Sequence, residues 1–165
     1  MVVLAGEGHC EVTLVTKLIE DGQLIFSYDD ILDNRVIHLR QPIKIAPLIN
    51  ILDINEKITF YRIGDTQNDE FDTSCFGELR RKNIEVIKVC TTPEIEILII
   101  INENLYNDYK KVQNKISPKE YVKIHVKKYS SFDDYINSHD MTNAIREYKR
   151  LKKKKGDIYL ADLLK

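Results

Sequence analysis

Apolar residues form short runs along the chain, and segments with a helical period separate several of them. Residues 1–5 form a continuous apolar run, which is typical of a strand buried on both faces of a sheet. Residues 57–63 alternate in character, and residues 84–90 are again mainly apolar. Residues 23–28 and 35–39 are shorter segments that are also compatible with strands. The sequence therefore predicts strands in these five segments.

Helical spacing of apolar residues, together with helix start and stop signals, predicts the intervening elements. Asp21-Gly22 is a stop signal for the first helix, and Pro93 occupies the favoured first position of a later one, with Thr92 as its N-cap. Ser117-Pro118-Lys119-Glu120 is a capping box that opens another helix. Apart from the helix that opens at this capping box, the predicted helices cover residues 12–21, 42–52, 73–82, 93–111, 131–138 and 142–154.

Strands that alternate with helices predict an α/β fold, with a mostly parallel sheet flanked by helices on both faces. A chain of 165 residues is long enough for one such domain with a sizeable core. We expect an α/β core over residues 1–115. Residues 116–165 are then a helical C-terminal extension packed on that core, within one domain overall.

Composition favours a folded protein that does not enter a membrane. Hydrophobic residues make up 43% of the chain and charged residues 31%, which is too apolar for a disordered protein. The longest apolar run, Ile95–Ile101, is far shorter than a membrane span and contains Glu96. The first residues show no basic leader, and the three cysteines form no paired metal or redox motif. These features predict a cytoplasmic protein.

The charges are unevenly distributed, although the net charge is only −1. Residues 1–90 carry 10 Lys/Arg and 15 Asp/Glu, whereas residues 91–165 carry 15 and 11. An acidic half beside a basic half is the distribution expected of a metal site next to a surface that binds a polyanion. It is also common by chance in a chain of this size, so it indicates a function only weakly.

Acidic residues follow three of the predicted strands. Glu7 comes after the first strand, with Glu11 four residues later, and Asp65 follows the strand that ends at Ile63. Glu94 and Glu96 follow the strand over residues 84–90. Ligand sites of parallel sheets lie at the carboxyl ends of strands, and hard cations such as Mg²⁺ prefer several oxygen ligands. The sequence predicts a divalent-metal site at this edge.

Three segments around these acidic residues resemble the Toprim domain. Residues 3–11, VLAGEGHCE, are similar to its first motif, in which a strand ends in Glu-Gly and a second Glu follows in the next helix. Residues 62–65, RIGD, resemble the strand-end Asp of its second motif. Residues 92–100, TPEIEILII, are similar to a segment that RloB-like and other overcoming-lysogenization-defect (OLD) nucleases carry after the last strand.

This resemblance implies a nuclease that hydrolyses phosphodiester bonds with Mg²⁺ or Mn²⁺. The implied metal ligands are Glu7, Glu11, Asp65 and Glu96, and Glu7 and Asp65 are also the implied catalytic residues. Two bound metals would activate water and stabilise the leaving oxygen. RloB-like proteins are thought to act in phage defence beside an ATPase, so the resemblance also implies an ATPase partner.

The second motif departs from the family pattern, which has Asp-x-Asp. This chain has Gln67 at the second Asp position, and Gln67 offers a carbonyl oxygen without a charge. Asp69 supplies the missing charge if the loop folds back toward the strand end. We therefore add Gln67 and Asp69 to the candidate metal ligands.

Basic residues are candidates for contacts with nucleic acid. Arg62 lies beside the second motif, and Lys152, Lys153 and Lys154 belong to a basic run with an interleaved tyrosine, Tyr148. The same run is compatible with the solvated end of a helix, where cations favour the helix dipole. The sequence does not decide between these interpretations.

Each candidate residue also has an interpretation without catalysis. Glu7 can be a carboxylate that stabilises a helix start, the acidic loop after Asp65 can be solvated, and His9 can be either a general base or an ordinary surface residue. Glu96 lies in an apolar segment, and a buried carboxylate requires a metal or a basic partner. The alternatives to a nuclease are thus a catalytically silent Toprim-like module that binds a protein or nucleotide, and a structural domain whose acids form ion pairs.

Overall fold

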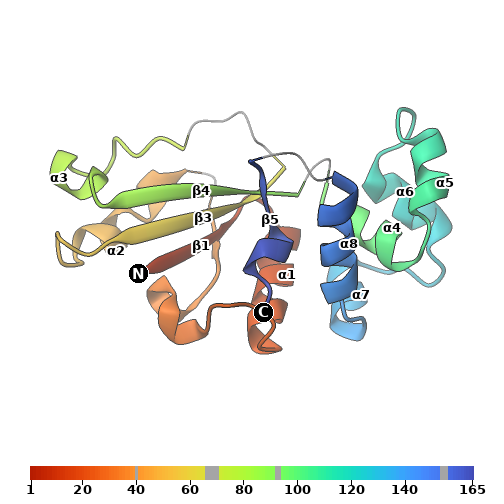
Figure 1. Ribbon diagram of the computed structural model, residues 1–165, viewed down its shortest axis with the longest axis horizontal. Helices are drawn as coiled ribbons and strands as arrows, with labels where there is room; N and C mark the ends of the chain where they lie inside the picture. The colour runs from red at the N-terminus through yellow and green to blue at the C-terminus, as the bar shows by residue number, and fades with distance from the viewer. Residues whose placement is uncertain (40, 66–70, 92–93, 153–155) are drawn as a thin grey trace.

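The computed structural model describes the chain except residues 40, 66–70, 92–93 and 153–155, and it has the predicted α/β fold (Figure 1). One sheet of five strands lies in the order β2-β1-β3-β4-β5, and every neighbouring pair is parallel. The strands are β1 (Val2–Gly6), β2 (Ile37–His38), β3 (Ile58–Gly64), β4 (Ile84–Cys90) and β5 (Ile158–Tyr159). Both edge strands have only two residues, which limits pairing with another sheet.

The strand register brings the carboxyl ends of the strands to one edge of the sheet. Gly6 of β1 lies opposite Ile63 of β3 and His38 of β2. Cys90 of β4 lies opposite Gly64 and Tyr159. Residues that directly follow β1, β3 and β4 therefore emerge side by side, as the sequence analysis requires for a shared site.

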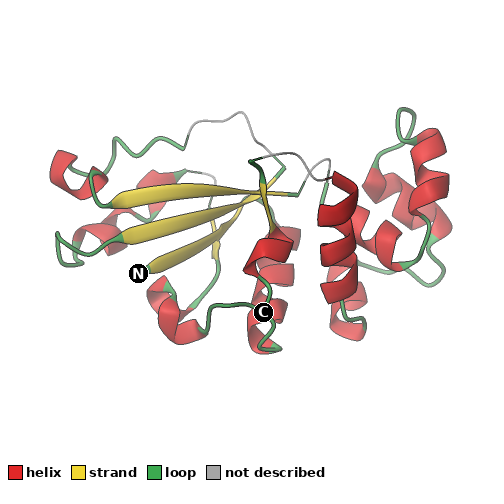
Figure 2. Ribbon diagram, in the orientation of Figure 1, coloured by secondary structure: helices red, strands yellow, loops and turns green. Residues whose placement is uncertain are grey.

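Most of the helices lie near this carboxyl edge or beyond it. Figure 2 shows α4 to α8 grouped past the carboxyl ends of the strands, whereas α2 and α3 lie near the opposite end of the sheet. The helices are α1 (His9–Glu20), α2 (Ala46–Asn50), α3 (Glu78–Arg81), α4 (Ile97–Asn102), α5 (Tyr106–Val112), α6 (Pro118–His125), α7 (Phe132–Ser138) and α8 (Thr142–Lys152). The capping box predicted at Ser117 is present at the start of α6.

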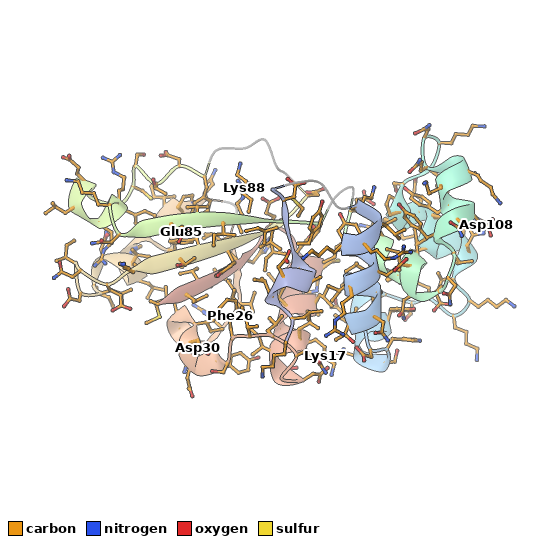
Figure 3. The ribbon with its side chains drawn as sticks, in the orientation of Figure 1. Lys17, Phe26, Asp30, Glu85, Lys88 and Asp108 are labelled. Atoms are coloured by element: carbon orange, nitrogen blue, oxygen red, sulfur yellow. The ribbon has the colours of Figure 1, made fainter. Side chains whose placement is uncertain are left out.

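Two hydrophobic clusters cover the two faces of the sheet. The larger one joins alternate residues of the strands to α1, to the buried helix α4 and to the helices around it. On this face Phe26, labelled in Figure 3, contacts Tyr61 of β3 with their ring centroids 5.1 Å apart. The smaller cluster packs the opposite face, including the fully buried Phe60, against α2 and Phe76. The alternation predicted for residues 57–63 is thus confirmed.

Two predicted elements, a strand and a long helix, differ in kind or continuity from the structure. Residues 23–28 form no strand: Leu24 makes one isolated bridge to Leu164, and a 3-10 helix begins at Tyr28. The long helix predicted to reach residue 111 is divided into α4 and α5, because Asn104 adopts a left-handed backbone with φ of 58°. The start predicted for it at Thr92 and Pro93 falls outside the described residues, and the described helix α4 begins only at Ile97.

The helices predicted over residues 42–52 and 73–82 are shorter than expected. The first is interrupted between the 3-10 turn Pro42–Lys44 and α2, and the second is reduced to α3. The extension over residues 116–165 contains the predicted helices but also supplies β5, which joins the sheet beside β4. Two residues are too short a pattern to be recognised as a strand in the sequence.

No helix in the described part of the chain has the length and apolar character needed to cross a membrane. The longest, α1 and α8, have 12 and 11 residues. Both carry charged residues on their outer faces, which suits helices that cover a globular core.

The end of α1 provides a direct test of the local backbone. Gly22 has φ of +66°, so an alanine there should destabilise the protein by about 1 kcal/mol. Gly77 is the matched control, since its φ of −53° suits any residue and an added Cβ has no atom within 4 Å. We expect urea unfolding to show the loss for Gly22→Ala, and little change for Gly77→Ala. Equal losses would contradict the assigned helix end.

Candidate functional site

Glu7 and Asp65 stand together at the carboxyl edge of the sheet. The Glu7 N–H donates to the carbonyl oxygen of Ile63 at 3.0 Å, so Glu7 continues the pairing of β1 with β3. The Thr91 N–H likewise donates to the Gly64 carbonyl oxygen at 3.0 Å, which continues the pairing of β3 with β4. The residues that follow β1, β3 and β4 are thereby held next to one another.

A cavity of about 340 Å³ lies at this edge, and its lining is strongly acidic. Five carboxylates face two cationic side chains, those of Arg62 and Lys119. The acidic lining residues are Glu7, Glu11, Asp65, Glu94 and Glu96. Four of the six predicted metal ligands therefore share one cavity. The other two, Gln67 and Asp69, fall outside the described residues.

Two glycines allow the carboxylates to lie against the backbone. A Cβ on Gly64 would lie only 2.3 Å from the carboxylate carbon and one oxygen of Glu7. A Cβ on Gly8 would lie 2.6 Å from a carboxylate oxygen of Glu11. Any larger residue at these positions would displace the acid. The sequence motifs Glu-Gly and Gly-Asp thus include glycines because the side chains of Glu7 and Glu11 occupy the space.

Glu7 forms a buried ion pair with Arg62. The Arg62 Nε lies 2.6 Å from the Glu7 Oε1, and the two side chains are 5% and 8% exposed. The Arg62 guanidinium also lies 5.8 Å from the centre of the Phe71 ring. Arg62, predicted to contact nucleic acid, therefore lines the acidic cavity and does not lie on an open surface. His38 contacts the same residue, with its Nε2 3.0 Å from the Glu7 carbonyl oxygen.

Glu11 and Glu96 are buried carboxylates that form no ion pair with any described residue. They are 8% and 6% exposed. Burial raises the pKa of Glu11, and the negative charges of Asp65, Glu96 and Glu7 raise it further. Burial also raises the pKa of Glu96, with contributions from Glu94 and Asp65. The ionised forms of both residues are therefore destabilised in this conformation.

Glu94 links the cavity to the first turn of α6. One of its carboxylate oxygens accepts a hydrogen bond from the Lys119 backbone N–H at 3.1 Å. Lys119 also lines the cavity, and its positive charge opposes part of the rise that burial causes in the pKa of Glu96. No local motif in the sequence connects Lys119 with the acidic residues, so sequence analysis did not identify it.

His9 and Cys10 line the cavity mouth, with different chemistry. The His9 Nε2 lies 2.8 Å from the Asp133 Oδ2, so His9 has a partner on α7 that the sequence did not reveal. Burial raises the pKa of Cys10 to about 11, and the charges of Glu96 and Glu11 add to this effect. Burial and the neighbouring carboxylates thus favour the protonated thiol, which makes Cys10 a poor thiolate nucleophile.

The carboxylates surround the cavity but do not converge on one point. Among the described residues, no three His, Cys, Asp or Glu side chains form a group that could hold a metal ion. One carboxylate oxygen of Glu7 is held by Arg62, and Glu94 is held by the Lys119 backbone. The donor set consists of hard oxygen atoms, which suits Mg²⁺ or Mn²⁺, and a bound cation would have to draw these side chains together.

The predicted nucleic-acid residues at the end of α8 are only partly described. Lys152 is the last residue of α8 and is half-buried. It lines a second cavity, which also includes Glu94. Lys153 and Lys154 lie outside the described residues.

Comparison with protein-family models, with curated proteins and with solved structures found no match to this chain.

The two buried carboxylates predict how the stability of the metal-free protein changes with pH. Because folding raises the pKa of Glu11 and Glu96, the folded state binds their protons more tightly than the unfolded state. The free energy of unfolding should fall as the pH rises above 4.5, the ordinary pKa of a glutamate side chain. At pH 7 in EDTA, Glu11→Gln and Glu96→Gln should therefore be more stable than the parent, and this gain should vanish near pH 4. Exposed Glu20→Gln is the control. A gain that is independent of pH would contradict the assignment.

The ion pair between Arg62 and Glu7 provides a second test. Arg62→Met leaves the buried Glu7 carboxylate without its cation, which should cost about 3–5 kcal/mol. Adding Glu7→Gln should recover part of this loss, since the unpaired charge is then removed. Urea unfolding of the two single variants and the double variant gives the coupling energy. Strictly additive losses would show that the two side chains are not coupled.

Proposed function

We propose that the chain is a Toprim-type phosphodiesterase that hydrolyses nucleic acid with Mg²⁺ or Mn²⁺. The observation that carries the proposal is the burial of Glu11 and Glu96, neither of which forms an ion pair with a described residue, in a cavity shared with Glu7 and Asp65. A structural domain would pair or remove such charges, because an isolated buried carboxylate is costly. A divalent cation would stabilise the ionised forms that burial and the neighbouring carboxylates disfavour.

The charge of the cavity supports a cationic ligand. Five carboxylates and two cations give a negative site, which would repel a phosphodiester by itself. Glu7, Glu11, Asp65 and Glu96 are the residues that would hold the metal. They lie in the loop after β1, in α1, in the loop after β3 and just before α4, respectively. When bound, divalent cations polarise the phosphate oxygens and lower the pKa of a coordinated water molecule.

The protein's own side chains have distinct roles in this proposal. Glu7 is fixed in position by Arg62 on one side and by the backbone of Gly64 on the other, so its carboxylate is oriented before any ligand arrives. Arg62 and Lys119 supply the positive charge in the cavity that a phosphate requires. The predicted action beside an ATPase in phage defence belongs to the same proposal.

One observation favours the second candidate, a catalytically silent module that binds a protein or nucleotide. Arg62 already neutralises Glu7, and no three described acids converge on a common point. Gln67 in place of a family aspartate agrees with this alternative. The two candidates differ in whether metal binding occurs and in whether a phosphodiester is cleaved.

Metal-linked stabilisation tests the proposal. Mg²⁺ or Mn²⁺ should raise the melting temperature at pH 7. When the metal concentration is 100 times its Kd, the free energy of unfolding should increase by about 2.7 kcal/mol. Glu96→Gln should abolish the rise, because it removes one ligand of the cavity. Glu85→Gln is the matched control: Glu85 lies exposed on β4 in the same sheet, away from the cavity lining (Figure 3).

The same proteins should then be assayed for metal-dependent cleavage of a labelled oligonucleotide. Cleavage by the parent and by Glu85→Gln, with loss in Glu96→Gln, supports the phosphodiesterase. A flat melting temperature across millimolar Mg²⁺ and Mn²⁺, together with no cleavage, would contradict it and favour the silent module.

A further inference from the structure

A second cavity, of about 570 Å³, adjoins the acidic one. The two share Glu94 as a lining residue. At the start of α6, Lys119 lines the acidic cavity, whereas Ser117 and Pro118 line the second cavity. Because the two cavities share a lining residue and have adjacent residues in their linings, one extended ligand can contact both.

The lining of the second cavity differs in chemistry from that of the first. Two lysines, two amide side chains and two hydroxyl side chains contribute to its lining. These residues are Lys115, Lys152, Gln113, Asn114, Ser117 and Tyr109. Apart from the shared Glu94, no acidic residue in the described part of the chain lines it. The positive charge thus lies directly beside the negative cavity.

This combination of groups fits a nucleotide unit. Lysine ammonium groups bind phosphate oxygens, while amide side chains can donate to and accept from base edges. Within the described residues Lys115 forms no ion pair, so its charge is available to a ligand. The volume lies within the range of about 300–1,000 Å³ that is typical of ligand pockets.

We propose that the second cavity binds one nucleotide of a single-stranded nucleic acid, with the neighbouring phosphodiester in the acidic cavity. A concave site can receive a base only when that base is out of the duplex stack, which favours a single strand. Lys115 and Lys152 contact the phosphate of the bound nucleotide, and Lys119 lies between the two cavities. This inference rests on the proposed function, because it places the reacting phosphodiester beside Glu7 and Glu96.

Binding without turnover tests the second cavity directly. A labelled ten-nucleotide thymidine oligonucleotide is titrated with the protein in EDTA and in Ca²⁺, with anisotropy as the readout. Lys115→Gln should weaken binding several-fold at low salt and lower the salt slope by about 0.7, which corresponds to one lost phosphate contact. Lys82→Gln, which removes an exposed lysine next to α3, is the matched control and should leave affinity and slope unchanged.

Turnover then separates this inference from the proposed function. Lys115→Gln should raise KM for the oligonucleotide while leaving metal-dependent hydrolysis of bis(4-nitrophenyl) phosphate unchanged, because that small diester needs only the acidic cavity. If Lys115→Gln cleaves the oligonucleotide with unchanged KM and affinity, the nucleotide site in the second cavity is contradicted, whereas the proposed hydrolase activity is supported. If the oligonucleotide binds in a way that depends on Lys115 but is not hydrolysed, the proposed hydrolase activity is contradicted and the nucleotide site is supported. If the parent protein binds no oligonucleotide, the proposal that the second cavity binds a nucleotide is contradicted.

Discussion

The close approach of the Glu7 side chain to the backbone of Gly64 is the contact on which the acidic cavity depends. It exists because β1 and β3 are parallel neighbours in a register that carries Glu7 just past Ile63. With the carboxylate pressed against β3, Arg62 of that strand can reach it at 2.6 Å. The remaining acidic residues line the cavity around this ion pair. Their burial and mutual repulsion follow from this arrangement and not from any local preference of their own.

The sequence predicted the fold class and the central strands well, because their signals are local. The strand over residues 84–90 matches β4, and the stop at Asp21-Gly22 and the capping box at Ser117 appear where expected. The failures arise where local signals are weak or are overridden. Asn104 follows the apolar run Ile95–Ile101 and separates α4 from α5, where the sequence predicts one helix to residue 111. The two-residue strand β5 pairs with the edge of β4 and has no pattern of its own.

The candidate site was predictable only in part, for the same reason. Glu7, Glu11, Asp65 and Glu96 follow strand ends or helix starts, and that position alone brings them to one cavity. The partners that determine their chemistry come from distant segments and leave no pattern near the acids. Asp133 beside His9, and Lys119 beside Glu94, are set by how α6 and α7 pack on the rest of the molecule.

The pairing of β5 with β4 has a consequence for how the chain reaches its native state. This strand joins residues 158–159 to residues 89–90, and Leu24 is bridged to Leu164 across most of the sequence. Contacts of such long sequence separation form late, since the entropy of closing the intervening loop opposes them. Until they form, the edge of β4 at residues 89–90, which β5 covers in the folded protein, stays open to other chains. During synthesis on the ribosome, a nascent chain that has not yet added these residues is therefore the species most exposed to misassociation.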